Sequence, residues 1–205
     1  MSKPADGKSA QGVSRRAFLK TVGVGAAATG LAGAATGVAQ AAPPPAILGP
    51  GRVPLSLTIN GAVHRLRVEP RVTLLRALRN HLGLTGAKEV CERGGCGACT
   101  VLLDGEPVCA CMMLAVDAEG HQITTVEGLG TPERMSPVQA AFVEADALQC
   151  GFCTPGFVVA STALLATHPN PSLDEIKAGL AGNLCRCGTY SRVFEAVQLA
   201  AKRRG

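Results

Sequence analysis

Aromatic residues are scarce in this chain: it has no tryptophan, one tyrosine and five phenylalanines, together 3% of its 205 residues. A core must therefore be built from the smaller apolar residues within the 47% hydrophobic fraction, mainly alanine, valine, leucine and isoleucine. This composition excludes a disordered or fibrous chain and fits one or two globular domains. A core this small gains stability when the fold also binds metal or a partner subunit.

Groups suited to acid-base or nucleophilic catalysis are equally few. The four histidines are scattered along the chain, at His64, His81, His121 and His168. Catalysis of this kind needs several such groups at one point. We therefore expect no catalytic residue in this chain.

The first 41 residues have the pattern of a targeting segment. "SRRAFLK" at 14–20 carries the pair Arg15 and Arg16, and the uncharged run "TVGVGAAATGLAGAATGV" follows it. This order predicts a twin-arginine signal peptide over 1–41, with Ala39 and Ala41 at the cleavage site and a linker over 42–52. A membrane anchor is the alternative, but the run is rich in glycine and alanine instead of leucine, so we expect no stable span. The prediction places the protein in the periplasm, exported already folded.

The net charge of +5 belongs mostly to that segment, which contains five basic residues and one acidic residue. Without it the chain carries a net charge of about +1. No basic stripe or aromatic platform remains, so we expect no nucleic-acid partner.

Residues 53–128 have the pattern of a small mixed sheet. "VPLSLTINGAVHRLRVE" alternates apolar and polar residues on either side of Asn60-Gly61, which predicts a hairpin with a two-residue turn. "TLLRALRNHLGL" predicts a short helix with Thr73 as its N-cap. "CTVLLDGEPVCAC" predicts two strands about an Asp104-Gly105 turn, and "HQITTVEGL" predicts one more.

From Thr131 onward, helical patterns replace the strand patterns. A capping box from Ser172 to Glu175 begins one of the expected helices. The spacing of apolar residues predicts helices over 137–148, 155–167, 173–181 and 190–202. Four short helices joined by short loops indicate a bundle over 131–205. The expected fold class is therefore α+β.

The stretch "CERGGCGACT" holds three of the nine cysteines in the C-x4-C-x2-C spacing of plant-type ferredoxins: Cys91, Cys96 and Cys99. Such a loop binds a 2Fe-2S cluster, and its glycines let the backbone approach the cluster and direct amide groups at the sulfurs. The fourth ligand is Cys109 or Cys111, and we expect only one of these two to face the cluster.

A second set consists of Cys150 and Cys153 in "CGFC" and Cys185 and Cys187 in "CRC". Eight ligands for two clusters leave one of the nine cysteines over. Zinc in the second set and disulfides throughout are the alternatives, and export to an oxidising space favours disulfides. However, Cys185 and Cys187 are too close to bridge each other easily, and loop spacings this tight favour metal.

Three strings, "CERGGCGACTVLLDGEPV", "QCGFCTPG" and "GNLCRCG", resemble the iron-sulfur subunits of the xanthine oxidase family of molybdenum hydroxylases. The resemblance extends over about residues 53–203. It implies a plant-ferredoxin-like β-grasp domain followed by a four-helix bundle, with one 2Fe-2S cluster in each. The chain would then be the electron-transfer subunit of a molybdenum-dependent oxidoreductase and not catalytic alone.

The resemblance also implies roles for single residues. It selects Cys111 as the fourth ligand of the first cluster and leaves Cys109 as a buried free thiol. Gln149 matches a glutamine that contacts the molybdopterin cofactor of the neighbouring subunit. The second cluster is then held by Cys150, Cys153, Cys185 and Cys187.

The partners implied by the resemblance begin with a large molybdenum-binding subunit, which oxidises an aldehyde or, as second choice, an N-heteroaromatic compound. Electrons leave it through the bundle cluster first and the ferredoxin-like cluster second. "CRCGTY" stands where many members have "CRCTGY", so the acceptor is either FAD in a medium subunit or haem in a c-type cytochrome. The alternative function is a stand-alone exported ferredoxin-like shuttle.

Overall fold

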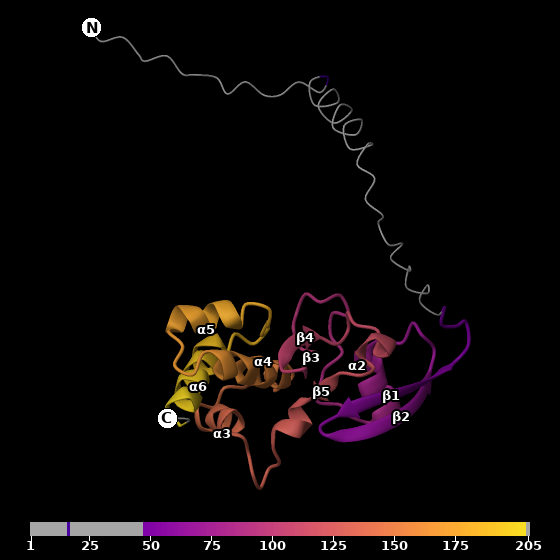
Figure 1. The fold of residues 1–205 in the computed structure, drawn as a ribbon. Helices are drawn as coiled ribbons and strands as arrows, with labels where there is room; N and C mark the ends of the chain where they lie inside the picture. Colours follow the sequence, from indigo (N-terminus) through magenta and orange to yellow (C-terminus); the bar gives the residue numbers. More distant parts are fainter. Residues whose placement is uncertain (1–15, 17–46, 204–205) are drawn as a thin grey trace, which may run out of the picture. The chain divides into compact units, whose positions relative to one another are not determined.

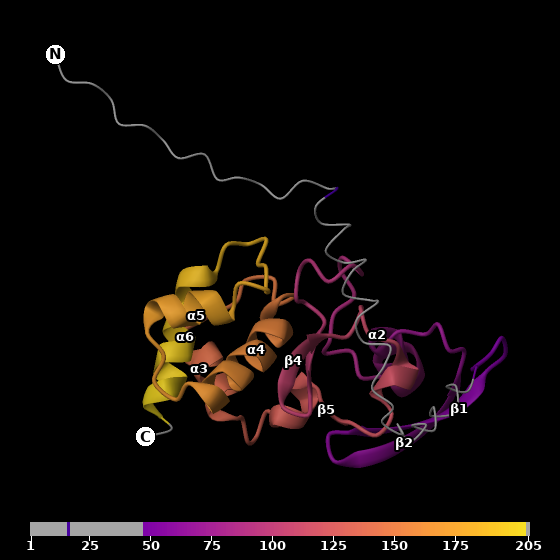
Figure 2. The ribbon, with the colours of Figure 1, turned by 45° about the horizontal axis from the view of Figure 1, so that its top comes forward.

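The computed structural model describes Arg16 and residues 47–203, and the chain from Ile47 onward forms one compact unit. The predicted signal peptide over 1–41 lies outside the described residues except for Arg16, as does the first part of the linker. Figures 1 and 2 show the unit as a sheet with helix α2 and, beside it, a group of helices from α3 to α6.

The chain after the linker forms the predicted hairpin. Strands β1 (Val53–Ile59) and β2 (Ala62–Val68) pair antiparallel throughout their lengths. Asn60 and Gly61 form the turn with φ angles of 51° and 80°, the conformation that a tight two-residue hairpin requires. The hairpin prediction is confirmed.

The sheet has five strands in the order β2-β1-β5-β3-β4. The later strands are β3 (Thr100–Leu103), β4 (Glu106–Cys109) and β5 (Gln122–Thr124), each in a segment predicted as a strand. β5 pairs parallel with β1 and antiparallel with β3, so it lies in the middle of the sheet. Because β3 and β4 pair antiparallel, the loop before β3 and the turn after β4 lie at the same end of the sheet.

The helix predicted after Thr73 is present but irregular. α2 spans Leu74–Arg76 and continues directly as a π-helical turn, η1, over Ala77–His81. Thr73 is the N-cap as predicted, and its hydroxyl accepts a hydrogen bond from the Arg76 amide at 3.3 Å. The apolar face of this segment belongs to the same buried cluster as the inward side chains of β1, and both consist of aliphatic residues.

Four helices occupy the segments predicted to be helical: α3 (Pro137–Glu144), α4 (Thr154–Thr167), α5 (Leu173–Gly179) and α6 (Tyr190–Lys202). α3 ends earlier than predicted because Asp146 has a φ of 46°, which a right-handed helix cannot continue through. The Ser172–Glu175 capping box is confirmed, and Ser136 with Gln139 forms a second one that "SPVQ" also encodes. Two short 3-10 segments, η2 (Ala115–Ala118) and η3 (Val126–Leu129), lie before α3.

Helix α4 joins the helical region to the sheet. Its Val159 and Ala163 pack against Leu102 of β3 in a small buried cluster. The larger core of the helical region contains two fully buried aromatic rings, Phe142 and Phe157. The scarce aromatics are thus concentrated in the helical region, whereas the sheet core is aliphatic, as the composition predicts.

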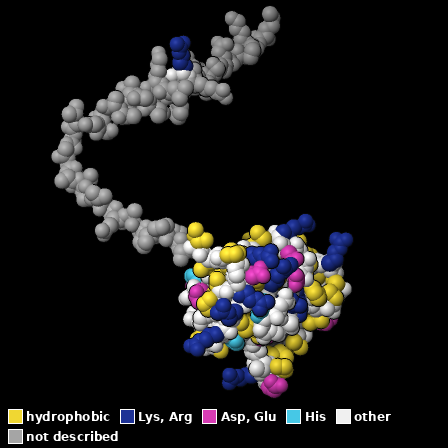
Figure 3. Space-filling model, turned by 90° about the vertical axis from the view of Figure 1, so that its right-hand side faces the viewer, with side chains coloured by type: hydrophobic (Ala, Val, Ile, Leu, Met, Phe, Trp, Pro, Cys, Tyr) yellow, Lys and Arg dark blue, Asp and Glu magenta, His cyan; other side chains and the backbone are white. Residues whose placement is uncertain are grey.

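The surface carries charges of both signs. On the face drawn in Figure 3, basic and acidic side chains lie beside each other, together with hydrophobic ones. Arg71 and Glu69, for example, form an exposed ion pair at 2.6 Å. Among the described residues, no helix is both long and apolar enough to cross a bilayer.

Candidate metal centres

The first cysteine loop connects the α2 region to β3 and reverses direction several times. Glu92, Gly94 and Gly97 have φ angles of 49°, 69° and 67°, in the left-handed region. Glycine adopts such positive φ angles without steric cost, so the two glycines let the backbone bend sharply within this loop. Three predicted ligands lie on this loop: Cys91, Cys96 and Cys99.

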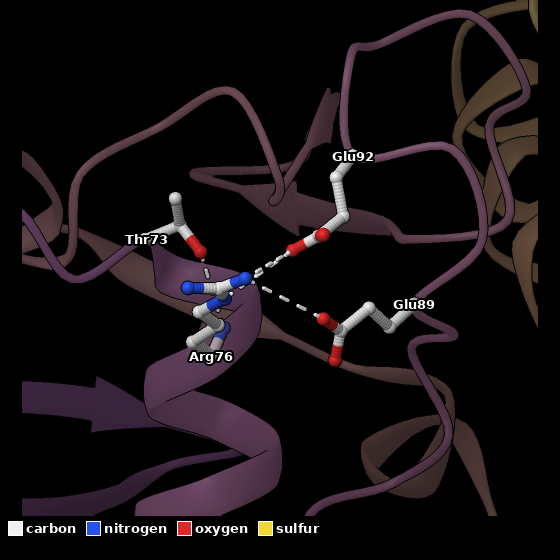
Figure 4. A network of polar contacts seen from close by, with 4 residues as sticks. All are labelled: Thr73, Arg76, Glu89 and Glu92. Atoms are coloured by element: carbon white, nitrogen blue, oxygen red, sulfur yellow. Dashed lines mark hydrogen bonds and ion pairs between the residues drawn. The ribbon is translucent and has the colours of Figure 1, made fainter.

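An ion-pair network ties the start of this loop to α2 (Figure 4). The Arg76 guanidinium contacts Glu92 Oε1 through Nη2 at 2.9 Å and through Nε at 3.2 Å. Glu89 lies on the same guanidinium, with its Oε1 3.8 Å from Nη2. Because Glu92 directly follows Cys91, this forked contact restrains the loop beside a predicted ligand.

The thiols of the first set contact one another in pairs. Hydrogen bonds from the Arg93 amide and the Cys96 side chain lower the pKa of Cys91 to about 7. Burial raises the pKa of Cys99 to about 12, and the neighbouring Cys111 thiol contributes to this rise. The fold therefore places Cys91 next to Cys96, and Cys99 next to Cys111.

Cys109 lies close to the same thiols. Its Sγ is 3.9 Å from the Gly94 carbonyl oxygen, burial raises its pKa, and its side chain also hydrogen-bonds with Cys99. Both Cys109 and Cys111 lie near Cys99, so the expectation that only one of them faces the cluster stays a prediction. Residues two apart on a strand share a face. Here β4 ends at Cys109, and a turn follows in which the Met112 amide donates to the Cys109 carbonyl at 2.9 Å. This turn brings Cys111 back towards Cys99.

The second set lies on the two loops that lead into α4 and α6. Cys150 and Cys153 precede α4, and Cys185 and Cys187 precede α6. The Sγ atoms of Cys150 and Cys187 are 3.6 Å apart. Burial raises the pKa of Cys153 to about 12, and the neighbouring Cys185 thiol adds to this rise. In this second set, each pair takes one thiol from each loop.

Two residues not singled out from the sequence hold Cys185 in place. Thr189 Oγ1 lies 3.1 Å from the Cys185 sulfur, and the Cys185 amide donates to the hydroxyl of Tyr190 at 2.9 Å. Burial opposes ionisation of Cys185, but hydrogen bonds from the Thr189 side chain and backbone, with others, lower its pKa to about 7. Both residues stand in "CRCGTY", and Tyr190 is the one tyrosine of the chain, which is the signal that could have found them.

Gln149 lies at the surface beside the second set. Its side-chain Nε2 donates to the carbonyl oxygen of Cys187 at 3.5 Å. Cys150 and Cys187 are themselves exposed, whereas Cys185 is buried. The predicted cofactor-contacting residue therefore stands next to the exposed thiol pair.

The donor sets fit binuclear clusters. A 2Fe-2S cluster takes four thiolates, two on each iron, and each set offers two contacting thiol pairs. Within the described residues, no three His, Cys, Asp or Glu side chains surround a point suited to a single metal ion. Cys99 has two thiol neighbours, Cys109 and Cys111, and each set can supply the four thiolates of one 2Fe-2S cluster.

The four histidines lie in separate places. His64 is on β2, His81 ends the π-helical turn and His168 follows α4. His121 pairs through Nδ1 with Asp104 Oδ2 at 2.5 Å, at the β3–β4 turn. The structure does not bring these histidines together.

Comparison with protein families gives two matches that together run from residue 57 to residue 198. A "2Fe-2S iron-sulfur cluster binding domain" matches residues 57–124, and a "[2Fe-2S] binding domain" matches residues 125–198. The first match contains the first cysteine set with Cys109, and the second contains the second set.

Individual relatives agree with these matches. The aldehyde oxidoreductase iron-sulfur-binding subunit PaoA of Escherichia coli O157:H7 is 43% identical over 173 residues, which cover 77% of this chain and 76% of that protein. The nicotine 6-hydroxylase small subunit of Paenarthrobacter nicotinovorans is 47% identical over 146 residues, 71% of this chain and 88% of that protein.

A similar structure has also been solved. In the crystal structure of quinoline 2-oxidoreductase from Pseudomonas putida 86, one chain is 46% identical and superposes with a TM-score of 0.72. The match covers 75% of this chain and 98% of that one. With the paired cysteine motifs and their geometry, these likenesses establish that the chain belongs to the iron-sulfur subunits of the xanthine oxidase family of molybdenum hydroxylases.

Proposed function

We propose that this chain carries electrons through two 2Fe-2S clusters. The observation that carries the proposal is the arrangement of thiols in contacting pairs within each set. Such clusters accept and release single electrons at a potential set by their thiolates, hydrogen bonds and burial. The first cluster's ligands are Cys91, Cys96, Cys99 and Cys111, and the second cluster's ligands are Cys150, Cys153, Cys185 and Cys187.

The two clusters belong to two domains in this proposal. A β-grasp, plant-ferredoxin-like domain over 53–128 holds the first cluster, and a four-helix bundle over 131–205 holds the second. The separate buried cores of the sheet and of the helices support this division. The backbone and hydroxyl groups around each loop then position the sulfurs and limit their contact with water.

The partner in this proposal is a large subunit that holds the molybdopterin cofactor, which Gln149 contacts. Exposed apolar side chains near Gln149 support a partner surface, since Val143 and Phe152 are 60% and 50% exposed. Val143 also lines a hollow of about 390 Å³, together with Met135, Leu148 and Pro155, among others. Hydrophobic exposure of this kind is typical of a surface that a second protein covers.

The substrate of the assembled enzyme is proposed to be an aldehyde, because PaoA of Escherichia coli is named as part of an aldehyde oxidoreductase. N-heteroaromatic compounds are the second choice, supported by the relatives named for nicotine and quinoline. The acceptor is proposed to be a flavin subunit or a c-type cytochrome. The protein is proposed to act in the periplasm after twin-arginine export.

Metal and sulfide analysis of the purified chain tests this function. We expect about four irons and a matching amount of acid-labile sulfide per chain, with a red-brown colour. Zinc in place of iron in the second set, or about two irons per chain, would contradict the two-cluster assignment. Copurification with a molybdenum-containing large subunit separates the proposal from a stand-alone ferredoxin-like shuttle, which would purify alone.

A further inference from the structure

The two cysteine-bearing loops touch each other directly. The Leu184 amide donates a hydrogen bond to the carbonyl oxygen of Cys96 at 2.9 Å. Cys96 belongs to the first set, and Leu184 directly precedes Cys185 of the second set. One hydrogen bond therefore joins a residue that carries a first-set thiol to the neighbour of a second-set thiol.

Asn183 lies beside this hydrogen bond and is buried, with 7% of its surface exposed. Its side-chain Nδ2 donates to the Gly97 carbonyl at 2.9 Å and to the hydroxyl oxygen of Thr100 at 3.3 Å. The Thr100 hydroxyl in turn donates to the same Gly97 carbonyl at 2.6 Å. The side-chain amide of Asn183 therefore donates both of its hydrogens to the end of the first cysteine loop and the start of β3.

The backbone segments around Asn183 approach one another closely. A Cβ on Gly97 would lie 2.4 Å from the Gly182 carbonyl oxygen, and one on Gly156 would lie 2.3 Å from the Gly97 carbonyl oxygen. Real Cβ atoms do not approach other atoms so closely, so glycine at these positions permits the loops to meet. Asn183 fills the remaining space between them, and a buried amide there must be hydrogen-bonded to be stable.

We infer that Asn183 is a positioning residue for electron transfer, which holds the first cysteine loop against the second so that the Cys96–Leu184 hydrogen bond connects the two sites. The inference rests on the proposed function, because it assigns the connection to two clusters. Asn183 contacts no cysteine sulfur in this role and exchanges no proton or covalent bond. It acts by keeping two backbone segments at a fixed separation, and electronic coupling between redox centres weakens steeply as that separation grows.

The test replaces Asn183 with aspartate, which has nearly the same shape but no hydrogen to donate. In Asn183→Asp, a carboxylate faces the Gly97 carbonyl oxygen, and two oxygen acceptors repel each other. We expect hydrogen exchange at the Leu184 amide to rise about tenfold or more, as for the loss of a buried hydrogen-bond partner. In the chain assembled with its large subunit, we expect weaker magnetic splitting between the two reduced clusters by EPR, with iron content unchanged.

Two further variants make the result decisive. Thr162→Val removes a hydroxyl that donates to the Val158 carbonyl within α4 at 2.8 Å, and should change neither readout because it lies in the helix. Thr100→Val removes the second acceptor of Asn183 together with the hydroxyl's own hydrogen bond to the Gly97 carbonyl, and it leaves the Asn183–Gly97 hydrogen bond in place. It should shift both readouts in the same direction by less, and it replaces Asn183→Asp as the test if that variant does not fold.

The outcomes separate the inference from the proposed function. A wild-type chain without two clusters would contradict the proposed function, and the exchange measurement would still report on the contact between the loops. A wild-type chain that holds four irons but shows no magnetic splitting would overturn the inference. Wild-type splitting and wild-type exchange in a folded Asn183→Asp variant, or in Thr100→Val where that variant takes its place, would also overturn it.

Discussion

At the scale of single residues, Cys109 and Cys111 show what cysteine spacing leaves open. Both thiols lie near enough to Cys99 to affect its pKa or be affected by it, so proximity to that residue does not distinguish them. Their surroundings differ. Cys109 ends β4 and contacts the Gly94 carbonyl, whereas Cys111 follows the turn and is buried. The ligand spacing therefore identifies the first cluster site, and the choice of its fourth ligand needs an experiment.

Serine substitutions at these two positions make that choice. We expect Cys111→Ser to lose the first cluster, so that iron falls to about two per chain. Cys109→Ser should keep both clusters, because the hydroxyl can still donate to the Gly94 carbonyl. Iron analysis and EPR of the reduced protein measure both effects, and the reverse pattern would identify Cys109 as the ligand.

Asp104 gives a pH-dependent contribution to stability at the β3–β4 turn. Hydrogen bonds from His121 and from the Gln122 amide lower the pKa of its carboxyl below the ordinary value of 3.8. A carboxyl whose pKa is lower in the folded state stabilises the fold above its unfolded pKa, and the contribution is lost as the pH falls through the folded pKa.

Asp104→Asn should therefore flatten the loss of stability on acidification below about pH 4. Asparagine is suited to the φ of 50° at this position, so the turn itself should persist. Chemical denaturation from pH 2 to pH 7 measures the effect. An unchanged acid dependence in the variant would show that the Asp104 contacts contribute nothing to it.

At the scale of elements, local chemistry predicts much more than long-range pairing does. Asn60-Gly61 and Asp104-Gly105 predict their hairpins because each dipeptide adopts the positive φ angles that a tight turn needs. The parallel pairing of β5 with β1 has no local signal, since the two strands are distant in sequence. The π-helical turn after α2 has no sequence signal either, because the apolar spacing fits a regular helix as well.

Gly156, on the first turn of α4, is expected to tolerate no side chain. Its hypothetical Cβ meets the Gly97 carbonyl oxygen, which belongs to the first cysteine loop and cannot move without it. Gly156→Ala should destabilise the fold by about 1–3 kcal/mol, as overpacking does. Gly182→Ala is the matched control, since nothing lies within 4 Å of its Cβ position. Thermal unfolding compares the two, and equal melting temperatures would contradict the close approach.

At the scale of the whole molecule, the cysteine pattern predicts two sites but not how they are joined. Asn183 stands inside "GNLCRCG", yet its contacts with Gly97 and Thr100 lie 86 and 83 residues away in sequence. Spacing within a motif reports on local geometry only, so a contact between two motifs becomes visible in the fold alone.

Export is predicted to depend on both arginines of the signal segment. Cys99 and Cys185 are buried in the folded chain, so a route that carries an already folded protein suits clusters held by these residues. Replacement of Arg15 and Arg16 by lysine keeps the charge but removes the pair that the receptor reads. We expect the variant to accumulate in the cytoplasm with about four irons per chain and full activity in its complex.

Cell fractionation followed by iron and activity assays of each fraction measures this outcome. The matched control replaces Lys3 and Lys8 by arginine, which also exchanges two basic residues upstream of the same apolar run and should leave export unchanged. Normal periplasmic activity from the Arg15→Lys, Arg16→Lys variant would point to the general secretory route. That route carries unfolded chains into an oxidising space, so it would favour disulfides over clusters for the nine cysteines.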